Sequence, residues 1–461
     1  MVASTVSTTN AQDADRRSHL HPFTSAADHA SSLPRMMVAG EGIRVRDSEG
    51  NEYVDAMAGL WCVNAGYGRN EIVDAAADQA RRLPYYHTFS GIANEPAARL
   101  AERLVSLAPG DMAKVFFGSS GSETNDTQVK IVRYYHNVLG KPDKKKIIAR
   151  RGAYHGSTLA GASLSGLPHM HRGFDLPLDG FLHVASPHYW RGAPSGMTER
   201  EFSASLAEDL EACILREGPE TVAAFIAEPV QGAAGVITPP EGYFEAVLPV
   251  LRKHDVLFIA DEVICGFGRL GAWWGSQRYG LEPDLVSSAK GLTSGYVPMS
   301  ACLISERVWS VLEEGSAEYG PFAHGYTYSG HPVAAAAALA NLDVIEGEGL
   351  VDNAAKVGAH LQSSLRDAFS DHPLVGEVRG VGLMAGVELV EDRSTKKSFA
   401  PSRAVARRLH ALLMEEGLIC RPVFDTLTFS PPLILTEADV DSIVSMFAKG
   451  LERLTRELGR T

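Results

Sequence analysis

An acid and a lysine, Asp261 and Lys290, each follow a short apolar run of the sequence. Residues 256–260 (VLFIA) and 285–289 (LVSSA) have the pattern of short buried strands. Because ligands of open α/β sheets bind outside the carboxyl ends of the strands, both side chains are expected to face one crevice. Burial would lower the pKa of the lysine and leave a neutral amine that can attack a carbonyl carbon. The pair therefore predicts carbonyl chemistry at a sheet edge.

Pyridoxal phosphate is the cofactor that this pair of residue types suits. Its aldehyde binds a lysine amine as a Schiff base, and a carboxylate keeps its pyridine nitrogen protonated so that the ring withdraws electrons. Each residue also has a common alternative role. A lysine before glycine is usually a solvated surface residue, and an acid at a strand end is often a helix cap. Other features of the chain must decide.

The segment 118–123 (GSSGSE) predicts an anion site, because it follows a predicted strand and precedes a predicted helix. Ser120 and Glu123 have the spacing of a capping box. The free amides of Gly121 and Ser122 would face an anion at the helix N-terminus, where the helix dipole favours it. An ordinary capped helix is the alternative. No lysine follows the glycines, so the segment is not a nucleotide P-loop.

Three further polar or aromatic residues are predicted at the same edge. Tyr154 and His155 follow a predicted strand at 146–150, and Glu228 follows one at 221–227. The tyrosine could lie flat against a cofactor ring, and the glutamate would add a second carboxylate. Packing and helix capping explain these residues equally well when each is taken alone.

The composition sets wide limits on function. The chain has 461 residues, 45% of them apolar, which predicts two or three domains with large buried cores. A formal charge of -13 argues against a nucleic-acid surface. No apolar run has the length of a membrane span or the form of an export signal. The five cysteines are scattered and odd in number, which predicts a cytoplasmic protein with free thiols.

Strand-like and helix-like segments alternate, which predicts an α/β fold whose large domain has a mostly parallel sheet flanked by helices. The later segments 375–389 and 418–435 are β-like, and 437–458 has one apolar helical face. These predict a smaller α+β domain. The predicted division is a disordered leader at 1–18, an N-terminal segment that packs with the small domain at 19–70, a large cofactor-binding domain at 71–330 and a small C-terminal domain at 331–461.

Several strings of the sequence together resemble the class III aminotransferases, the pyridoxal-phosphate fold type I group. They are LFIADEVICGFGRLG, SSAKGL, SSGSETND, AYHG, EPVQG and HGYTYSGHP, and the resemblance runs from about His19 to the C-terminus. With HLHPFT, DAMAGLWCVNAGYG and ICRP, the chain is most similar to the ω-amino-acid or amine:pyruvate branch. The resemblance implies a homodimer with both active sites at the interface, and it leaves a tetramer open.

The resemblance assigns a cofactor role to each matching residue. Lys290 would form the Schiff base, and Asp261 would hold the pyridine nitrogen. Tyr154 would cover one face of the ring and Val263 the other. The remaining cofactor-binding residues would be Glu228 and His155 beside the ring, Ser120, Gly121 and Ser122 at the phosphate, and Thr327 from the other subunit.

The resemblance also implies a substrate pocket. Arg421 matches an arginine that pairs with a substrate carboxylate and swings aside for an amine that has none. Phe23, Trp61 and Phe89 match positions that line the pocket in similar enzymes, as does Tyr154, although sequence alone makes each aromatic a core residue as readily. The implied reaction moves an amino group from an ω-amino acid or primary amine to pyruvate, giving alanine, with ping-pong kinetics.

Other functions fit the sequence less well. Residues 266–271 satisfy GxGxxG after a strand, which would suit an NAD(P)-dependent dehydrogenase, but Asp261 and Glu262 would repel a pyrophosphate. Aminomutases and decarboxylating transaminases of the same fold are closer alternatives. Only the need for a separate keto acceptor, or release of carbon dioxide, would separate them.

No metal site is predicted. The chain lacks HExxH, and it also lacks the GxSxG pattern of serine hydrolases. The histidine pairs His19/His21 and His169/His171 have no acidic partner at ligand spacing.

Overall fold

The computed structural model describes residues 8–460 and has a seven-stranded sheet at its centre. The strand order is β4-β10-β9-β8-β7-β5-β6. The strands from β9 to β6 run parallel, and β10 runs antiparallel to both β4 and β9. The predicted α/β fold with a mostly parallel sheet is therefore confirmed. The strand bounds are β4 Met112–Gly118, β5 Lys146–Arg150, β6 Phe181–Val184, β7 Val222–Ala227, β8 Leu257–Asp261, β9 Leu285–Ser288 and β10 Ser300–Ser305.

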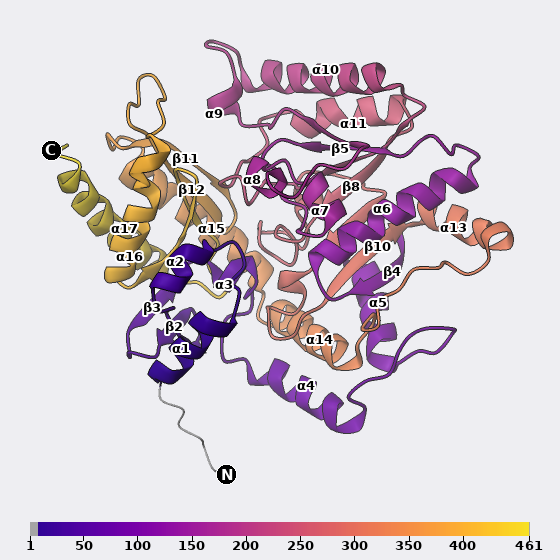
Figure 1. Ribbon diagram of the computed structural model, residues 1–461, viewed down its shortest axis with the longest axis horizontal. Helices are drawn as coiled ribbons and strands as arrows, with labels where there is room; N and C mark the ends of the chain where they lie inside the picture. Colours follow the sequence, from indigo (N-terminus) through magenta and orange to yellow (C-terminus); the bar gives the residue numbers. More distant parts are fainter. Residues whose placement is uncertain (1–7, 461) are drawn as a thin grey trace.

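Both faces of this sheet are covered, and its central strands β7 and β8 are buried at every residue. Successive residues of a strand point to opposite faces. Phe225 and Phe258 enter a core cluster with α11 (Tyr243–Lys253), whereas Ile226 and Ile259 enter a second cluster with α6 (Gly121–Val138). Figure 1 shows α10 (Glu199–Glu217) beside α11, and α13 (Glu306–Tyr319) near α6. The sheet thus forms the middle layer of a three-layer structure.

The C-terminal part contains a second sheet, which is antiparallel with the order β11-β12-β15-β14. A third sheet, β1-β2-β3-β13, joins the N-terminal strands to β13 of the C-terminal part. The domain boundaries stay a prediction. The bounds are β1 Met37–Glu41, β2 Arg44–Asp47, β3 Glu52–Asp55, β11 Val375–Val381, β12 Met384–Leu389, β13 Leu418–Ile419, β14 Arg421–Val423, β15 Thr426–Phe429, α15 Leu350–Phe369, α16 Val405–Glu415 and α17 Glu437–Glu457.

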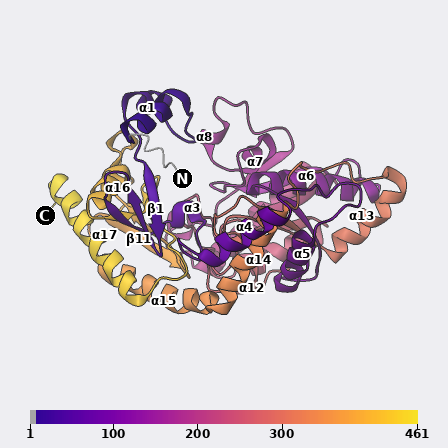
Figure 2. The same ribbon diagram turned by 90° about the horizontal axis from the view of Figure 1, so that it is seen from below.

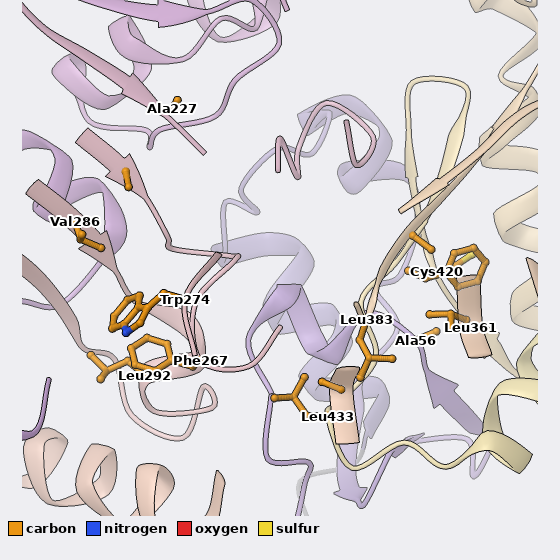
Figure 3. Packing of buried hydrophobic residues seen from close by; sticks show 14 of the residues in the cluster. Ala56, Ala227, Phe267, Trp274, Val286, Leu292, Leu361, Leu383, Cys420 and Leu433 are labelled. Carbon is orange, nitrogen blue, oxygen red and sulfur yellow. The ribbon is translucent and has the colours of Figure 1, made fainter. Parts of the chain in front are cut away.

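Two long helices, α4 (Asn70–Arg82) and α5 (Glu95–Leu107), pack against α14 (Pro332–Gly347). A single large hydrophobic cluster then runs from the central sheet into the C-terminal part. Figure 3 shows Phe267 and Trp274 at the sheet end of this cluster and Leu361 and Leu383 at the other. Within the described residues, no helix has the length and apolar character needed to cross a membrane.

The prediction of a disordered leader at 1–18 is wrong for its described part. Residues 1–7 lie outside the described residues, whereas Thr8–Ser18 form helix α1, which is followed by α2 (Ala26–Ser31). The polar sequence of α1 has no apolar face for a core, so its pattern resembles a disordered tail. Polar contacts hold it instead, including a hydrogen bond from Gln12 Nε2 to the Pro34 carbonyl at 3.0 Å.

Candidate active site

The candidate residues gather where neighbouring parallel strands of the central sheet end. β8 ends at Asp261, and its neighbour β9 ends just before Lys290. On the other side of β8, β7 ends just before Glu228, and β5 leads into Tyr154 and His155. The strand order therefore brings all five residues to one edge of the sheet.

The Asp261 carboxylate is buried and held by three polar groups. Its Oδ2 accepts a hydrogen bond from Asn125 Nδ2 at 2.9 Å and lies 2.8 Å from His155 Nδ1. Its Oδ1 accepts one from the Val263 amide at 3.1 Å. Burial opposes ionisation, but these contacts outweigh burial and hold the pKa of Asp261 below its ordinary value. Among residues 8–460 no lysine or arginine forms an ion pair with this anion.

Glu228 supplies a second buried carboxylate. Its Oε2 accepts from Arg150 Nη2 at 3.2 Å, and its Oε1 accepts from the Tyr154 amide at 3.2 Å. His155 lies between the two acids, because its Nε2 is 3.9 Å from Glu228 Oε2 while its Nδ1 contacts Asp261. The His155 Nε2 has no hydrogen-bond partner among the described residues.

Lys290 begins the 3-10 turn η1 (Lys290–Leu292) in a left-handed conformation with φ of 46°. A non-glycine residue in this region costs about 1–3 kcal/mol, which is typical of functional sites. Burial lowers the pKa of the lysine, and the charge of Arg421 acts in the same direction. Cys62 and Asp261 oppose this shift. The net effect raises the share of neutral amine at a given pH.

The predicted anion site forms the N-terminus of α6. Ser120 is the N-cap residue, and its side chain accepts a hydrogen bond from the Glu123 amide at 3.3 Å. The Glu123 carboxylate does not complete the predicted capping box at Ser120, because it accepts from the amide of Ser119 at 2.6 Å instead. The first amides of a helix have no partner within the helix and face outward. The helix end thus keeps donors available for a phosphate.

Close backbone approach shapes the same helix end. A Cβ atom on Gly121 would lie 2.9 Å from Val263 Cγ2, so glycine lets α6 start directly against Val263. A Cβ atom on Gly156 would lie 2.7 Å from Ser122 Oγ, and this hydroxyl accepts from the Ser157 amide at 3.1 Å. The segment after β5 is thereby fixed beside the start of α6.

Arg421 begins β14 in the C-terminal sheet and brings a cation toward the same region. Burial dominates the pKa of Lys290 and of Tyr154, and the positive charge of Arg421 also acts on both groups. Within residues 8–460 this guanidinium forms no hydrogen bond or ion pair with another side chain or backbone group. It is therefore available to an external anion. The ring of Phe23 lies edge-on to that of Tyr154, with 6.5 Å between the ring centroids.

The other three predicted site residues are not all gathered here. Trp61 is 2% exposed and packs in a core cluster with Met57 and Met384. Phe89 is 43% exposed, and its ring lies against Gly325. Thr327, two residues further along that loop, is also exposed, and its carbonyl accepts from the Tyr85 hydroxyl at 2.6 Å. Phe89 and Thr327 thus share one exposed surface rather than the edge near Lys290.

The residues at the sheet edge fit pyridoxal phosphate. Asp261 is a buried anion without a lysine or arginine partner in the described chain, and a protonated pyridine nitrogen needs such an anion. The buried atoms Asn125 Oδ1 and His155 Nε2 have no hydrogen-bond partner in the described chain. The start of α6 offers amide donors to a phosphate, and Lys290 offers an amine with a lowered pKa. The donor set therefore matches the ring nitrogen, the phosphate and the aldehyde of this cofactor.

Sequence reasoning missed two residues that hold the acids in place. Asn125 contacts Asp261 across 136 residues of sequence, and it also donates to the His155 carbonyl at 2.6 Å. Arg150 holds Glu228. Asn125 lies one helical turn after Gly121, on the face of α6 that packs on the sheet, and a buried amide on such a face was the available signal.

The dinucleotide alternative lacks its structural element. A GxGxxG site needs a helix that opens at the glycines and directs its N-terminus at the pyrophosphate. After Gly271 the chain forms only the four-residue helix α12 (Gly275–Arg278). The amides of Gly275 and Ser276 donate to the buried Glu262 carboxylate at 2.9 and 2.5 Å, so they are not free for a ligand.

Comparison with known proteins covers nearly the whole chain. The profile of a family described as aminotransferase class-III matches residues 25–451. A diaminobutyrate–2-oxoglutarate transaminase of Halomonas elongata is 50% identical over 454 residues, which cover 97% of each chain. A putrescine–pyruvate aminotransferase of Pseudomonas aeruginosa is 46% identical and covers 96% of each. The solved ω-transaminase of Pseudomonas jessenii in complex with PMP has a TM-score of 0.96 at 49% identity, covering 97% of this chain and 99% of that one.

Proposed function

We propose that the protein, which belongs to the class-III aminotransferase family, moves an amino group from an ω-amino acid or primary amine to pyruvate by a ping-pong mechanism. It is an enzyme of fold type I that uses pyridoxal phosphate and acts on small amines and keto acids. The observation that supports the finer proposal is that Lys290 and Asp261 lie at one edge of the central sheet, while the charge of the unpaired Arg421, from β14 of the C-terminal sheet, acts on Lys290.

When bound, the cofactor supplies an electron-withdrawing ring that stabilises the charge left on the donor carbon after proton loss. We assign Asp261 to the ring nitrogen, since it is a buried anion fixed by three polar contacts. Tyr154 and Val263 would lie on the two ring faces, with Glu228 and His155 beside them. The phosphate would be held by Ser120, Gly121 and Ser122, and by Thr327 of the second subunit.

Lys290 would bind the aldehyde until the amine of the donor displaces it, and the freed lysine would then serve as the acid and base. Its amine would take a proton from the amino-bearing carbon of the donor and return one to the carbon that was the aldehyde carbon of the cofactor. The lowered pKa supports this role, because only the neutral amine can accept a proton. Its position at a strained turn fixes the direction from which it reaches the substrate.

Arg421 would recognise the carboxylate of the keto acid. A guanidinium binds a carboxylate through two parallel hydrogen bonds. The site offers one unpaired guanidinium in the described chain, which suits an acceptor with one carboxylate such as pyruvate. The name of the Halomonas relative favours 2-oxoglutarate instead, which has two. Testing both acceptors separates these cases.

The two half-reactions are expected to be separable. A primary amine added alone should change the visible absorption of the holoenzyme once, and pyruvate should then restore it while one alanine per active site is released. Absorption spectra and amino-acid analysis measure both events. If 2-oxoglutarate restores the absorption and pyruvate does not, then 2-oxoglutarate is the acceptor. Turnover without any keto acid would instead favour an aminomutase. Release of carbon dioxide would favour a decarboxylating transaminase.

Replacing Arg421 with alanine is expected to raise the KM for pyruvate by about 10–100-fold, since a hydrogen bond to a charged group contributes about 1.5–3 kcal/mol. The half-reaction with an amine that has no carboxylate should change by less than about threefold. Rapid-mixing kinetics of each half-reaction measure the two effects. Arg172→Ala, at an exposed arginine just after α8 (Pro168–His171), is the control. Equal losses in both half-reactions would contradict the assignment.

We also propose that the enzyme is a cytoplasmic homodimer. Phe89 and the loop of Thr327 lie on one exposed surface, so a second copy could receive both of them at its active site. Five unpaired cysteines are consistent with a reducing compartment. Exposed apolar side chains in and near that surface, which a partner could cover, are Leu83, Tyr86, Phe89, Ile92 and Tyr328.

A further inference from the structure

Four residues near the N-terminus bring metal-ligating atoms together. Asp15 lies in α1, and His19, His21 and His29 lie after it, the last in α2. The sequence spacing gave no acidic partner to His19 and His21, and that expectation is wrong. The Asp15 carboxylate lies 2.9 Å from His19 Nδ1 and 2.8 Å from His21 Nε2. His29 Nε2, which no sequence pattern singled out, lies 3.5 Å from the same carboxylate.

These spacings are close to those of a metal site. Zinc bonds to nitrogen and oxygen are about 2.0 Å long, so two ligand atoms of a tetrahedral zinc ion are about 3.3 Å apart. The distance to Asp15 Oδ2 from His19 and the distances to Oδ1 from His21 and His29 bracket this value. Ligand atoms of Asp15, His19 and His21 also lie within 4.8 Å of one another, and His29 is the outermost member of the cluster. Three imidazoles and one carboxylate are also a ligand set that zinc and similar transition metals prefer.

Hydrogen bonding accounts for only one contact of the cluster, the one between His19 Nδ1 and Asp15 Oδ2 at 2.9 Å. Asp15 Oδ1, His21 Nε2 and His29 Nε2 are shielded from solvent and have no hydrogen-bond partner among the described residues. The 2.8 Å approach of His21 Nε2 to Asp15 Oδ1 thus lacks the alignment of a hydrogen bond. The rings of His21 and His29 pack against each other, with their centroids 4.2 Å apart and their planes at 31°. Buried polar atoms without partners are costly, and a bound cation would satisfy all three.

Space and charge also permit a cation here. His19, His21 and His29 line a cavity of about 290 Å³. Arg16 and Arg17 line it too, but Arg16 is paired with Asp13, and within residues 8–460 neither forms an ion pair with Asp15.

A second cluster in the chain lacks these properties. It comprises His188, Glu377 and Glu388. Arg379 already pairs with both glutamates, and Arg191 pairs with Glu388. A metal ion there would have to displace these guanidinium groups.

We propose that Asp15, His19, His21 and His29 bind a divalent transition metal ion, with zinc as the best match. The ion would tie α1 to α2 and so fix the turn between them, which carries Phe23. The Phe23 ring lies against Tyr154 and against His169 of α8. Figure 2 shows α1 and α8 on the same side of the molecule, and Figure 1 shows that they are well separated, so it is the turn after α1, and not α1 itself, that reaches α8. The metal site would therefore hold one wall of the substrate pocket in place.

Zinc titration of the full-length holoenzyme tests this proposal. Untagged protein, freed of metal by a chelator and then of the chelator, should bind one zinc ion per chain in competition with a coloured chelator, as elemental analysis confirms. His21→Ala and His29→Ala should each weaken zinc binding by at least about tenfold. His360→Ala is the matched control, because His360 contacts an acid, Asp441, at 2.8 Å without further ligands. Failure of the wild-type protein to bind stoichiometric zinc would overturn the proposal, as would unchanged binding by His29→Ala.

Trypsin digestion provides a second readout that does not depend on activity. Arg16 and Arg17 are cleavage sites between two of the proposed ligands, Asp15 and His19. Zinc should slow cleavage there several-fold in the wild-type protein and leave the rate unchanged in His29→Ala. A peptide substrate added to the same reactions controls for any effect of zinc on trypsin itself. Equal protection of both proteins would overturn the assignment of His29, and circular dichroism with cofactor content establishes that the variants are folded.

Discussion

Replacing Lys290 with alanine is expected to lower kcat/KM by at least about 10⁴-fold, because the substitution removes both the amine that binds the aldehyde and the group that moves the proton. The side chain lies at a strained turn after β9, so a residue next to it in the sequence would not reach the substrate from the same direction. Steady-state kinetics with an amine and pyruvate measure the loss. Borohydride reduction followed by peptide mass analysis should attach the cofactor to the peptide of Lys290 in the wild-type enzyme and to no peptide in the variant.

The matched control for this experiment is Lys253→Ala. Lys253 is an exposed lysine that pairs with Glu211 at 2.7 Å and lies at the end of α11. Its loss should leave kcat/KM and the borohydride result unchanged. Steady-state activity of Lys290→Ala within tenfold of wild type, in a protein that still binds the cofactor, would contradict the role given to Lys290.

Local patterns predicted the elements that carry the main site residues. The apolar runs before Asp261 and Lys290 form β8 and β9, because residues buried on both faces of a sheet leave a near-continuous hydrophobic signal. Helix α6 also begins where the cap at Ser120 predicts. Each of these features depends on a few consecutive residues, so it can be derived without knowledge of the fold.

Such local patterns could not predict contacts between segments that are distant in the sequence. Asn125 contacts Asp261 only because α6 packs across β7 and β9. The strand β10 enters the sheet antiparallel between β4 and β9, an order that no local signal specifies. Helix α1 likewise depends on partners beyond its own sequence, including Pro34. In each case the deciding interaction joins residues that the sequence separates.

The two acids of the site illustrate how environment divides roles between similar residues. Asp261 receives donors only from neutral or weakly basic groups, so its charge is available to the cofactor. Glu228 has a guanidinium partner in Arg150, so its charge is already balanced. Their strands are neighbours, so sequence position alone makes the two acids equal candidates for the partner of the ring nitrogen. The hydrogen-bond partners support Asp261, and not Glu228, as the partner of the ring nitrogen.

Replacing Asp261 with asparagine is therefore expected to lower kcat/KM by about 10³-fold or more. A neutral amide cannot hold a proton on the pyridine nitrogen, and the ring then withdraws electrons poorly. Loss of a preorganised charge that acts in the transition state typically costs about 10²–10³-fold, and loss of the ring proton adds to it. The dissociation constant of the cofactor should also rise. Kinetics and equilibrium dialysis with the cofactor measure the two effects.

A cofactor analogue with carbon in place of the ring nitrogen makes this prediction specific. With the analogue, the wild-type enzyme should fall to nearly the rate of Asp261→Asn, and the substitution should then cost little more, because both changes remove the same interaction. Losses that multiply would mean that Asp261 acts elsewhere, for example by positioning His155. Asp255→Asn, at a half-exposed acid that pairs with Lys141 and Arg307, should leave the rates with either cofactor unchanged.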